Sequence, residues 1–249
     1  HEKLLKFAQS IGMGGLGYLE VKEELKYKGP IDKFIPDDMK MELAEMAGLQ
    51  EGDTIFFIAA PEKAACIYAG QIRNELGSRL DLLEKDAYRF CYINDFPMYE
   101  IDEETGKLGF THNPFSMPQG GLEALNEKDP LDILAYQYDI VCNGVELSSG
   151  AVRNHDMEIM EKAFDIAGYD KETLKDKFGA LYNAFQFGAP PHAGMAPGVD
   201  RMIMLLRNEE NIREIIAFPM SGTAQDLMCG APNEITEQQL REVHIKVRD

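Results

Sequence analysis

Positive charge is scarce in this sequence. Its 249 residues include 25 lysines and arginines against 43 aspartates and glutamates, a formal net charge of −18. This balance keeps a protein in solution and disfavours a broad nucleic-acid-binding surface or an anionic membrane as a partner. The sequence also shows no signal peptide and no apolar run long enough to cross a bilayer. We therefore expect a cytoplasmic protein without a membrane partner.

Cysteine pairs with metal-binding or redox spacing are absent as well. The four cysteines are Cys66, Cys91, Cys142 and Cys229, and no two of them form a C-x-x-C motif. Because three of them lie within apolar runs, we expect buried free thiols in a reducing compartment. No internal repeat or low-complexity tract is present. Hydrophobic residues at 45% and charged residues at 27% are ordinary for a globular protein with a substantial core.

The first part of the chain is typical of a small α/β domain without a catalytic constellation. We predict a helix over residues 2–10, a helix over 39–47, a buried strand over 54–60, and a helix that Pro61 opens and Gly77 stops. Gly12–Gly17 fits G-x-G-x-x-G, but it leaves a helix and enters a strand, the reverse of a nucleotide-binding context. An acidic stretch at residues 81–86 marks the boundary between domains of residues 1–86 and 87–249.

A strong β-hairpin signal lies in the second part, at Ala135–Arg153. Asn143-Gly144 separates two runs rich in Val, Ile and Tyr, and it suits the positive φ angles of a type I′ turn. A two-residue turn fixes the register, so Asp139 should face Ser148. Asp139 and Glu146 would then be diagonal neighbours on one face, roughly 7–8 Å apart at the backbone. Two carboxylates at that separation can hold a divalent cation, although a simply solvated polar face explains the same pair.

In a regular strand, Arg153 would lie on the face opposite to these carboxylates. It lies seven residues after Glu146, an odd offset that points two side chains to opposite faces of a regular strand. A β-bulge between them would return Arg153 to the carboxylate side. We expect that bulge at Ser148–Gly150, because glycine tolerates the required dihedral angles.

Further strands and helices surround the predicted hairpin. We expect strands over residues 90–94, 98–101 and 109–111, a polar connection over 120–130, and two amphipathic helices after Arg153. Later in the chain, Gly194 and Gly198 allow a flat ligand to approach the backbone. Arg201 can stack on a heteroaromatic ring and reach a phosphate. A Gly/Pro turn before a core helix accounts for the same residues.

Several ordered motifs resemble class II aminoacyl-tRNA synthetases, specifically the aspartyl-tRNA synthetases of bacterial type. They are DFPMYE at residues 95–100, HNPF at 112–115, NGVELSSGAVR at 143–153, FGAPPHAG at 187–194, GMAPGVDRMIMLL at 194–206, NIREIIAFPM at 211–220 and CGAP at 229–232. The resemblance covers essentially the whole chain. It implies an α+β fold, with a class II synthetase-like antiparallel sheet flanked by helices. Residues 1–86 would be the C-terminal part of a smaller α/β insertion domain that precedes this sheet.

The resemblance also implies roles for individual residues. Asp139 and Glu146 would hold Mg²⁺ on ATP, and Glu146 and Arg201 would be the catalytic pair. The residues expected to bind ATP are Glu146, Arg153, Gly194, Gly198 and Arg201. Those expected to bind the amino acid are Arg153, His112, Asn113 and Ser149, with Arg153 gripping the side-chain carboxylate in a bidentate fork.

The activity implied is aspartate–tRNA ligation: ATP activates aspartate to aspartyl-adenylate, which is transferred to tRNA. Motifs 1 and 2 of the family and its anticodon-binding barrel are not found. We therefore expect a C-terminal fragment that is inactive alone, from a parent enzyme that dimerises through motif 1; the fragment itself is compatible with a monomer. The alternative is a non-catalytic binding module derived from such a synthetase. The presence of Asp139, Glu146, Arg153 and Arg201 together favours the enzyme.

Overall fold

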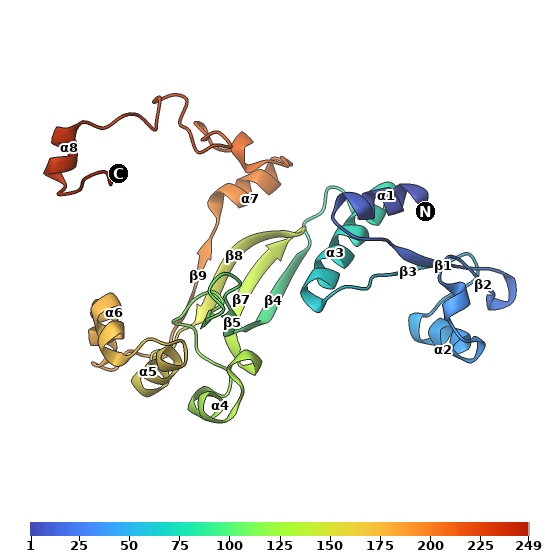
Figure 1. The fold of residues 1–249 in the computed structure, drawn as a ribbon, viewed down its shortest axis with the longest axis horizontal. Helices are drawn as coiled ribbons and strands as arrows, with labels where there is room; N and C mark the ends of the chain where they lie inside the picture. Colours follow the sequence, from blue (N-terminus) through green and yellow to red (C-terminus); the bar gives the residue numbers. More distant parts are fainter. Residues whose placement is uncertain (249) are drawn as a thin grey trace. The chain divides into compact units, whose positions relative to one another are not determined.

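The computed structural model describes residues 1–248 and divides into two compact units (Figure 1). The first unit comprises residues 1–87, and the second begins at Tyr88. This division falls one residue after the acidic stretch in the sequence. No helix within residues 1–248 is both long enough and apolar enough to cross a membrane.

A three-stranded antiparallel sheet and three helices form the first unit. The strands, in the order β2-β1-β3, are β2 (Tyr27–Lys28), β1 (Gly17–Val21) and β3 (Thr54–Phe57). The α-helices are α1 (Glu2–Ser10), α2 (Asp37–Ala47) and α3 (Glu62–Arg79), with 3₁₀ turns η1 (Glu23–Leu25) and η2 (Asp32–Phe34). Leu19 and Val21 of β1 pack in one apolar cluster, and Leu4 of α1 and Ile72 of α3 pack in another.

Two expectations for this unit were wrong in detail. Helix α3 continues past Gly77 to Arg79, because one glycine costs a helix only about 1 kcal/mol relative to alanine. Its buried face is narrow: Ile72 is buried, whereas Ile67 is 53% exposed. Strand β3 ends at Phe57 and is half-buried rather than fully buried. The Gly12–Gly17 segment does connect a helix to a strand, as expected of an accidental nucleotide-binding motif.

A four-stranded antiparallel sheet organises the second unit (Figure 1). Its strands, in the order β4-β7-β8-β9, are β4 (Phe90–Pro97), β7 (Leu134–Cys142), β8 (Val145–Val152) and β9 (Ala193–Pro197). Strands β5 (Tyr99–Ile101) and β6 (Leu108–Phe110) pair separately. The helices are α4 (Gly121–Glu127), η3 (Pro130–Asp132), α5 (Met157–Ile166), α6 (Lys171–Phe185), α7 (Val199–Leu206), η4 (Ile212–Glu214) and α8 (Glu237–Glu242). The predicted α+β class with an antiparallel sheet is confirmed.

The core of this unit joins one end of the sheet to helices α4, α5 and α6. Met98, Tyr99, Ala135, Leu125 and Ala163 form one buried cluster, and the Tyr99 hydroxyl donates to the Ala163 carbonyl at 2.9 Å. A second cluster, between α5 and α6, contains Met160, Phe164, Leu174 and Tyr182. Helix α4 was missed in the sequence, because it begins at two glycines with positive φ, Gly120 and Gly121, which are typical of a loop.

The cysteines differ from expectation in their exposure. All four are free thiols and Cys142 is buried, but Cys66, Cys91 and Cys229 are exposed. Cys91 lies on β4, which is at the edge of its sheet, and Cys66 lies on the exposed side of α3. An apolar run in the sequence does not tell which face of an element is covered.

Glu161 links α5 to α6 and should make stability depend on pH. Its carboxylate accepts hydrogen bonds from the Tyr182 hydroxyl (2.5 Å) and from Lys171 Nζ. Burial acts to raise the pKa of Glu161, but these two donors outweigh it and lower that pKa. A carboxyl with a lowered folded-state pKa stabilises the fold fully above the unfolded-state value, about 4.3. This stabilisation is lost as the pH falls through the lowered pKa.

We accordingly expect Glu161→Gln to cost about 1 kcal/mol of unfolding free energy at pH 7, after allowance for partial exposure. The difference from the unmodified chain should shrink below pH 4. Urea unfolding followed by circular dichroism at pH 7 and pH 3.5 checks this, with Glu104→Gln, an exposed carboxylate in the β5–β6 turn, as control. An equal loss at both pH values would contradict the assignment.

Candidate functional site

The hairpin of β7 and β8 contains a β-bulge at Leu147. Asn143 and Gly144 have φ angles of 50° and 80°, as the type I′ prediction requires. Val141 faces Glu146, but the next pair is Ile140 and Ser148, so Leu147 is the extra residue. Asp139 therefore faces Ser149, and the expected pairing with Ser148 was wrong.

This bulge determines which side chains share a face of the sheet. Glu146 and Ser149 lie on the face of Asp139, because residues that pair across antiparallel strands point the same way. Alternation from Ser149 then brings Arg153 to that face. We call the face of the sheet that carries Asp139, Glu146, Ser149 and Arg153 the carboxylate face. The expected break in alternation between Glu146 and Arg153 is confirmed, but its expected position at Ser148–Gly150 was wrong.

Packing around β8 explains why the bulge occurs at Leu147. The side chain of Leu147 is buried in an apolar cleft of about 290 Å³ between the sheet and α7. The Leu147 carbonyl accepts a hydrogen bond from the Gly198 amide at 2.7 Å, just before α7. Gly150 is not part of the bulge but pairs regularly with Tyr138. No larger residue fits there, because a Cβ would lie 2.5 Å from both the Gly194 carbonyl oxygen and the Tyr138 ring.

Gly150→Ala should therefore destabilise the chain strongly. Neither the Gly194 backbone nor the Tyr138 ring, whose hydroxyl is held by the Gly194 carbonyl at 3.0 Å, can move without disturbing the sheet. We expect a loss of about 3 kcal/mol, at the upper end of overpacking effects. Gly179→Ala, in α6 with no atom within 4 Å of the new Cβ, is the control and should be neutral or stabilising. Equal unfolding free energies for the two variants would contradict the packing argument.

Arg201 of α7 is bound to the edge of the carboxylate face. Its Nη1 donates to the Glu146 carbonyl at 2.8 Å and lies 3.1 Å from Glu146 Oε1. The two side chains are 44% and 46% exposed, so this ion pair contributes little to stability and is easily exchanged for another partner. Glu146 and Arg201, which the resemblance implies as the catalytic pair, are thus in direct contact, and their catalytic role stays a prediction.

A short segment, residues 115–119, is inserted between β7 and β8 where these strands separate. We call it the inserted strand. Its backbone bonds are Met117 N to Val152 O (2.8 Å) and Asn154 N to Phe115 O (2.7 Å) on one side, and Tyr136 N to Met117 O (2.9 Å) and Gln119 N to Leu134 O (2.8 Å) on the other. Ser116 consequently pairs with Arg153, and Pro118 pairs with Ala135. The loop before the inserted strand is thereby brought beside Arg153.

That loop carries two of the predicted substrate-binding residues. The His112 ring packs edge-on against Phe96, with centroids 5.2 Å apart. Asn113 Oδ1 accepts a hydrogen bond from the Phe115 amide at 2.9 Å, so this side chain stabilises the turn of its own loop. Contact of either residue with an amino acid stays a prediction.

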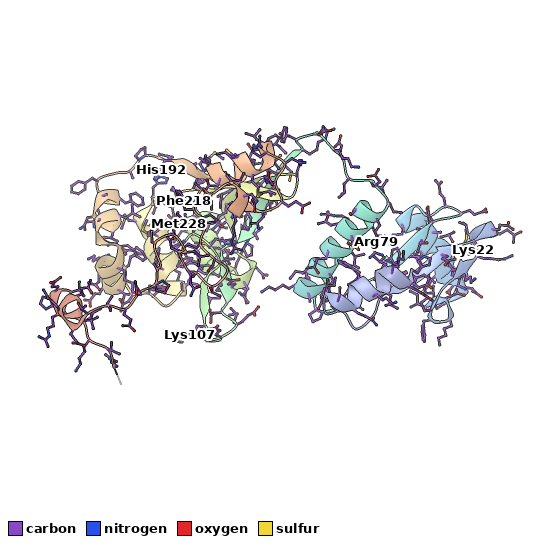
Figure 2. All side chains as sticks on the ribbon, turned by 90° about the horizontal axis from the view of Figure 1, so that it is seen from above. Lys22, Arg79, Lys107, His192, Phe218 and Met228 are labelled. Atoms are coloured by element: carbon purple, nitrogen blue, oxygen red, sulfur yellow. The ribbon has the colours of Figure 1, made fainter. Side chains whose placement is uncertain are left out.

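The backbone of Arg153 is held between two histidines. Its amide donates to the carbonyl of His192 at 2.9 Å, and its carbonyl lies 3.2 Å from His155 Nδ1. His192, labelled in Figure 2, directly precedes β9. Arg153 Nη2 lies beside Gly194, 3.9 Å from where a Cβ would stand, so the guanidinium lies next to a residue expected to bind ATP.

The carboxylates suit a metal that arrives with a phosphate ligand. Within residues 1–248 no three His, Cys, Asp or Glu side chains are grouped closely enough to hold a metal ion. Asp139 and Glu146 share a face and offer only oxygen atoms. Mg²⁺ prefers oxygen ligands and is usually bound by one or two carboxylates together with substrate phosphates. The donor set therefore fits Mg²⁺ bound to a nucleotide.

Sequence reasoning missed two buried polar residues of this region. Gln137 is 6% exposed and Ser116 is fully buried, and Gln137 Nε2 donates to Ser116 Oγ at 2.9 Å. The signal for Gln137 was available, because it precedes Asp139 by two residues and so lies on the carboxylate face. No pattern in the sequence indicated the inserted strand that carries Ser116.

Comparison with known proteins identifies the family. The model of the tRNA synthetases class II (D, K and N) matches residues 7–222. An aspartate–tRNA ligase of Streptomyces coelicolor is 56% identical over 99% of this chain and 42% of its own length. An aspartate–tRNA(Asp/Asn) ligase of Zymomonas mobilis is 55% identical over 97% of this chain and 40% of its own length. The chain thus spans about two fifths of these relatives.

A solved aspartyl-tRNA synthetase from Entamoeba histolytica is 22% identical, with a TM-score of 0.43, over 75% of this chain and 31% of its own. That similarity is too low to add to the assignment. The sequence matches suffice. The chain belongs to the class II tRNA synthetases (D, K and N).

Proposed function

We propose that this chain is the C-terminal part of an aspartate–tRNA ligase and supplies much of the site that activates aspartate with ATP. One observation carries the proposal: the bulge at Leu147 brings Asp139, Glu146 and Arg153 to one face, with Arg201 bound at its edge. Two carboxylates and two guanidinium groups on one surface suit a substrate that is both a nucleotide and a dicarboxylic amino acid.

Each side chain has a distinct part in the proposed reaction. Asp139 and Glu146 would hold Mg²⁺, which neutralises charge on the phosphates when bound. Arg153 would bind the side-chain carboxylate of aspartate and orient its other carboxylate toward the nucleotide. When ATP binds, Arg201 would break its contact with Glu146, stack on the adenine and contact the terminal phosphate. His112, Asn113 and Ser149 would border the amino acid, and Gly194 and Gly198 the nucleotide.

Activation then proceeds largely by positioning and electrostatics. A carboxylate oxygen of aspartate attacks the α-phosphorus of ATP, and pyrophosphate leaves as aspartyl-adenylate forms. A guanidinium fixed near the leaving phosphates stabilises the charge that develops on them. The adenylate is then transferred to tRNA, with release of AMP.

The remaining parts of the proposal concern the complete protein, which we call the parent enzyme. We propose that it supplies motifs 1 and 2 and the anticodon-binding barrel, acts as a cytoplasmic homodimer, and binds tRNA. One of the two relatives above is named for tRNA(Asp/Asn) and the other only as an aspartate–tRNA ligase, at nearly equal identity. Identity in this chain therefore does not separate the two tRNA specificities.

Pyrophosphate exchange into ATP tests the function directly. The parent enzyme should show exchange that requires aspartate and is not supported by asparagine or glutamate at equal concentration. The chain alone should show none. Nucleotide binding by the parent enzyme without aspartate-dependent exchange would instead support a non-catalytic binding module, which is the second candidate. Retention of all four charged residues favours the enzyme, since a binding module needs no such set.

A further inference from the structure

Gln137 lies at the point where β7 and β8 separate. It is paired with Ala151 on β8, and the preceding residues of β7, Leu134 to Tyr136, are bonded to the inserted strand instead. Gln137 is thus the residue of β7 at which pairing changes from the inserted strand to β8, and its side chain bonds the inserted strand. The side chain is 6% exposed, unusual for glutamine, which is mostly found at protein surfaces.

The side-chain amide of Gln137 bonds the inserted strand and the loop before it. Nε2 donates to Ser116 Oγ at 2.9 Å and lies 3.5 Å from the Asn113 carbonyl oxygen. Ser116 is fully buried. A hydrogen bond between buried groups resists displacement, because each group left without a partner costs the desolvation of a polar atom.

Ser116 connects Gln137 to Arg153 across the sheet. Ser116 pairs with Arg153 on the β8 side, and the register of the inserted strand with β7 puts Ser116 opposite Gln137. Gln137, Ser116 and Arg153 therefore form one cross-strand row on the carboxylate face. His112 directly precedes Asn113, and Gln137 Nε2 bonds both the Asn113 carbonyl and Ser116 Oγ.

We propose that Gln137 is a positioning residue for the aspartate pocket: it fixes the inserted strand, and through it the distance between the His112 loop and Arg153. This inference rests on the proposed function and deepens it. Gln137 does not contact the substrate. Its effect should be confined to the amino acid, because Glu146 and Arg201 lie at the other end of the hairpin, beyond the bulge.

The amide is suited to this task in a way that similar side chains are not. Its two N–H groups can serve the Ser116 hydroxyl and the Asn113 carbonyl together. Methionine has similar length but no donor. Glutamate could accept from Ser116 but would oppose the Asn113 carbonyl, and it would place a charge in a buried position. The variant that isolates the hydrogen bond is therefore Gln137→Met.

Steady-state pyrophosphate exchange by the parent enzyme tests the inference. Gln137→Met should raise KM for aspartate about 3- to 10-fold, the effect of one buried hydrogen bond, with KM for ATP within about twofold. Ser116→Ala should do the same. The double variant should be no worse than the more impaired single variant, because both remove the same bond. Gln238→Met is the matched control: its exposed amide donates to Glu242 Oε1 at 3.2 Å within α8, outside the sheet, and KM for aspartate should stay within about twofold.

Hydrogen exchange on the chain itself provides the second readout. In Gln137→Met the amides of Met117 and Asn154, which join the inserted strand to β8, should exchange at least about threefold faster. Unchanged exchange at these amides, an unchanged KM for aspartate, or equal increases in both KM values would overturn the positioning role. Absence of aspartate-dependent exchange in the unmodified parent enzyme would instead overturn the proposed function, so the two failures are distinguishable.

Discussion

Arg201→Ala in the parent enzyme should reduce aspartate-dependent pyrophosphate exchange by about 10²- to 10³-fold. That is the usual consequence of removing a preorganised group that stabilises charge developing in the transition state. Stability should change by less than about 1 kcal/mol, because the pair that Arg201 makes with Glu146 is exposed on both sides. A large kinetic loss with little structural cost would identify Arg201 as a functional rather than a structural residue.

The matched control is Arg207→Ala. Arg207 is an exposed arginine at the end of the same helix, so its removal changes the charge equally without touching the carboxylate face. We expect exchange within about twofold of the unmodified enzyme. If both variants lost activity alike, the effect would reflect the charge or stability of α7, and the role of Arg201 at the nucleotide would have to be abandoned.

Arg153→Lys should weaken the response to aspartate and leave ATP binding nearly unchanged. Lysine keeps the charge but replaces a two-pronged fork by a single point of contact. Loss of one charge-assisted hydrogen bond should cost about 1.5–3 kcal/mol, or roughly 10- to 150-fold in kcat/KM for aspartate. The backbone bond from the Arg153 amide to the His192 carbonyl does not depend on the side chain, so the strand should keep its place.

ATP affinity, measured separately by calorimetry without aspartate, is the internal control for this variant. A large loss of ATP affinity would place the guanidinium at the nucleotide instead, which its position beside Gly194 makes a real alternative. An unchanged aspartate response would remove Arg153 from the amino-acid pocket.

Local chemistry made part of this site predictable. Asn143-Gly144 determined the turn and thus the pairing of Val141 with Glu146, because a two-residue turn leaves no freedom of register. The odd offset of Arg153 then required one extra residue in β8. These inferences needed only the alternation of a strand and the conformational preference of a dipeptide.

The location of the bulge was not predictable in the same way. Gly150 suggested a bulge by its backbone freedom, yet its role is to leave space beneath the Tyr138 ring and beside the Gly194 carbonyl. Leu147 is the bulged residue because its side chain enters the cleft beside α7. Both reasons are tertiary contacts, with partners 12 to more than 40 residues away in the sequence.

The inserted strand was missed for a related reason. Residues 115–119 bury Ser116 and Pro118 rather than the apolar Phe115 and Met117, and proline is disfavoured within a sheet, so the sequence did not indicate a strand there. They pair on both sides only because β7 and β8 diverge and leave backbone groups of Tyr136 and Val152 without partners from each other. The buried contact between Gln137 and Ser116 follows from that insertion.

A structure of the parent enzyme with a non-hydrolysable aspartyl-adenylate analogue tests the central claim most directly. The account predicts the analogue on the carboxylate face, with its side-chain carboxylate on the Arg153 guanidinium. Arg201 should have left Glu146 and should lie against the adenine. An analogue bound on the opposite face of the sheet, or one that leaves Arg201 on Glu146 and Arg153 untouched, would contradict it.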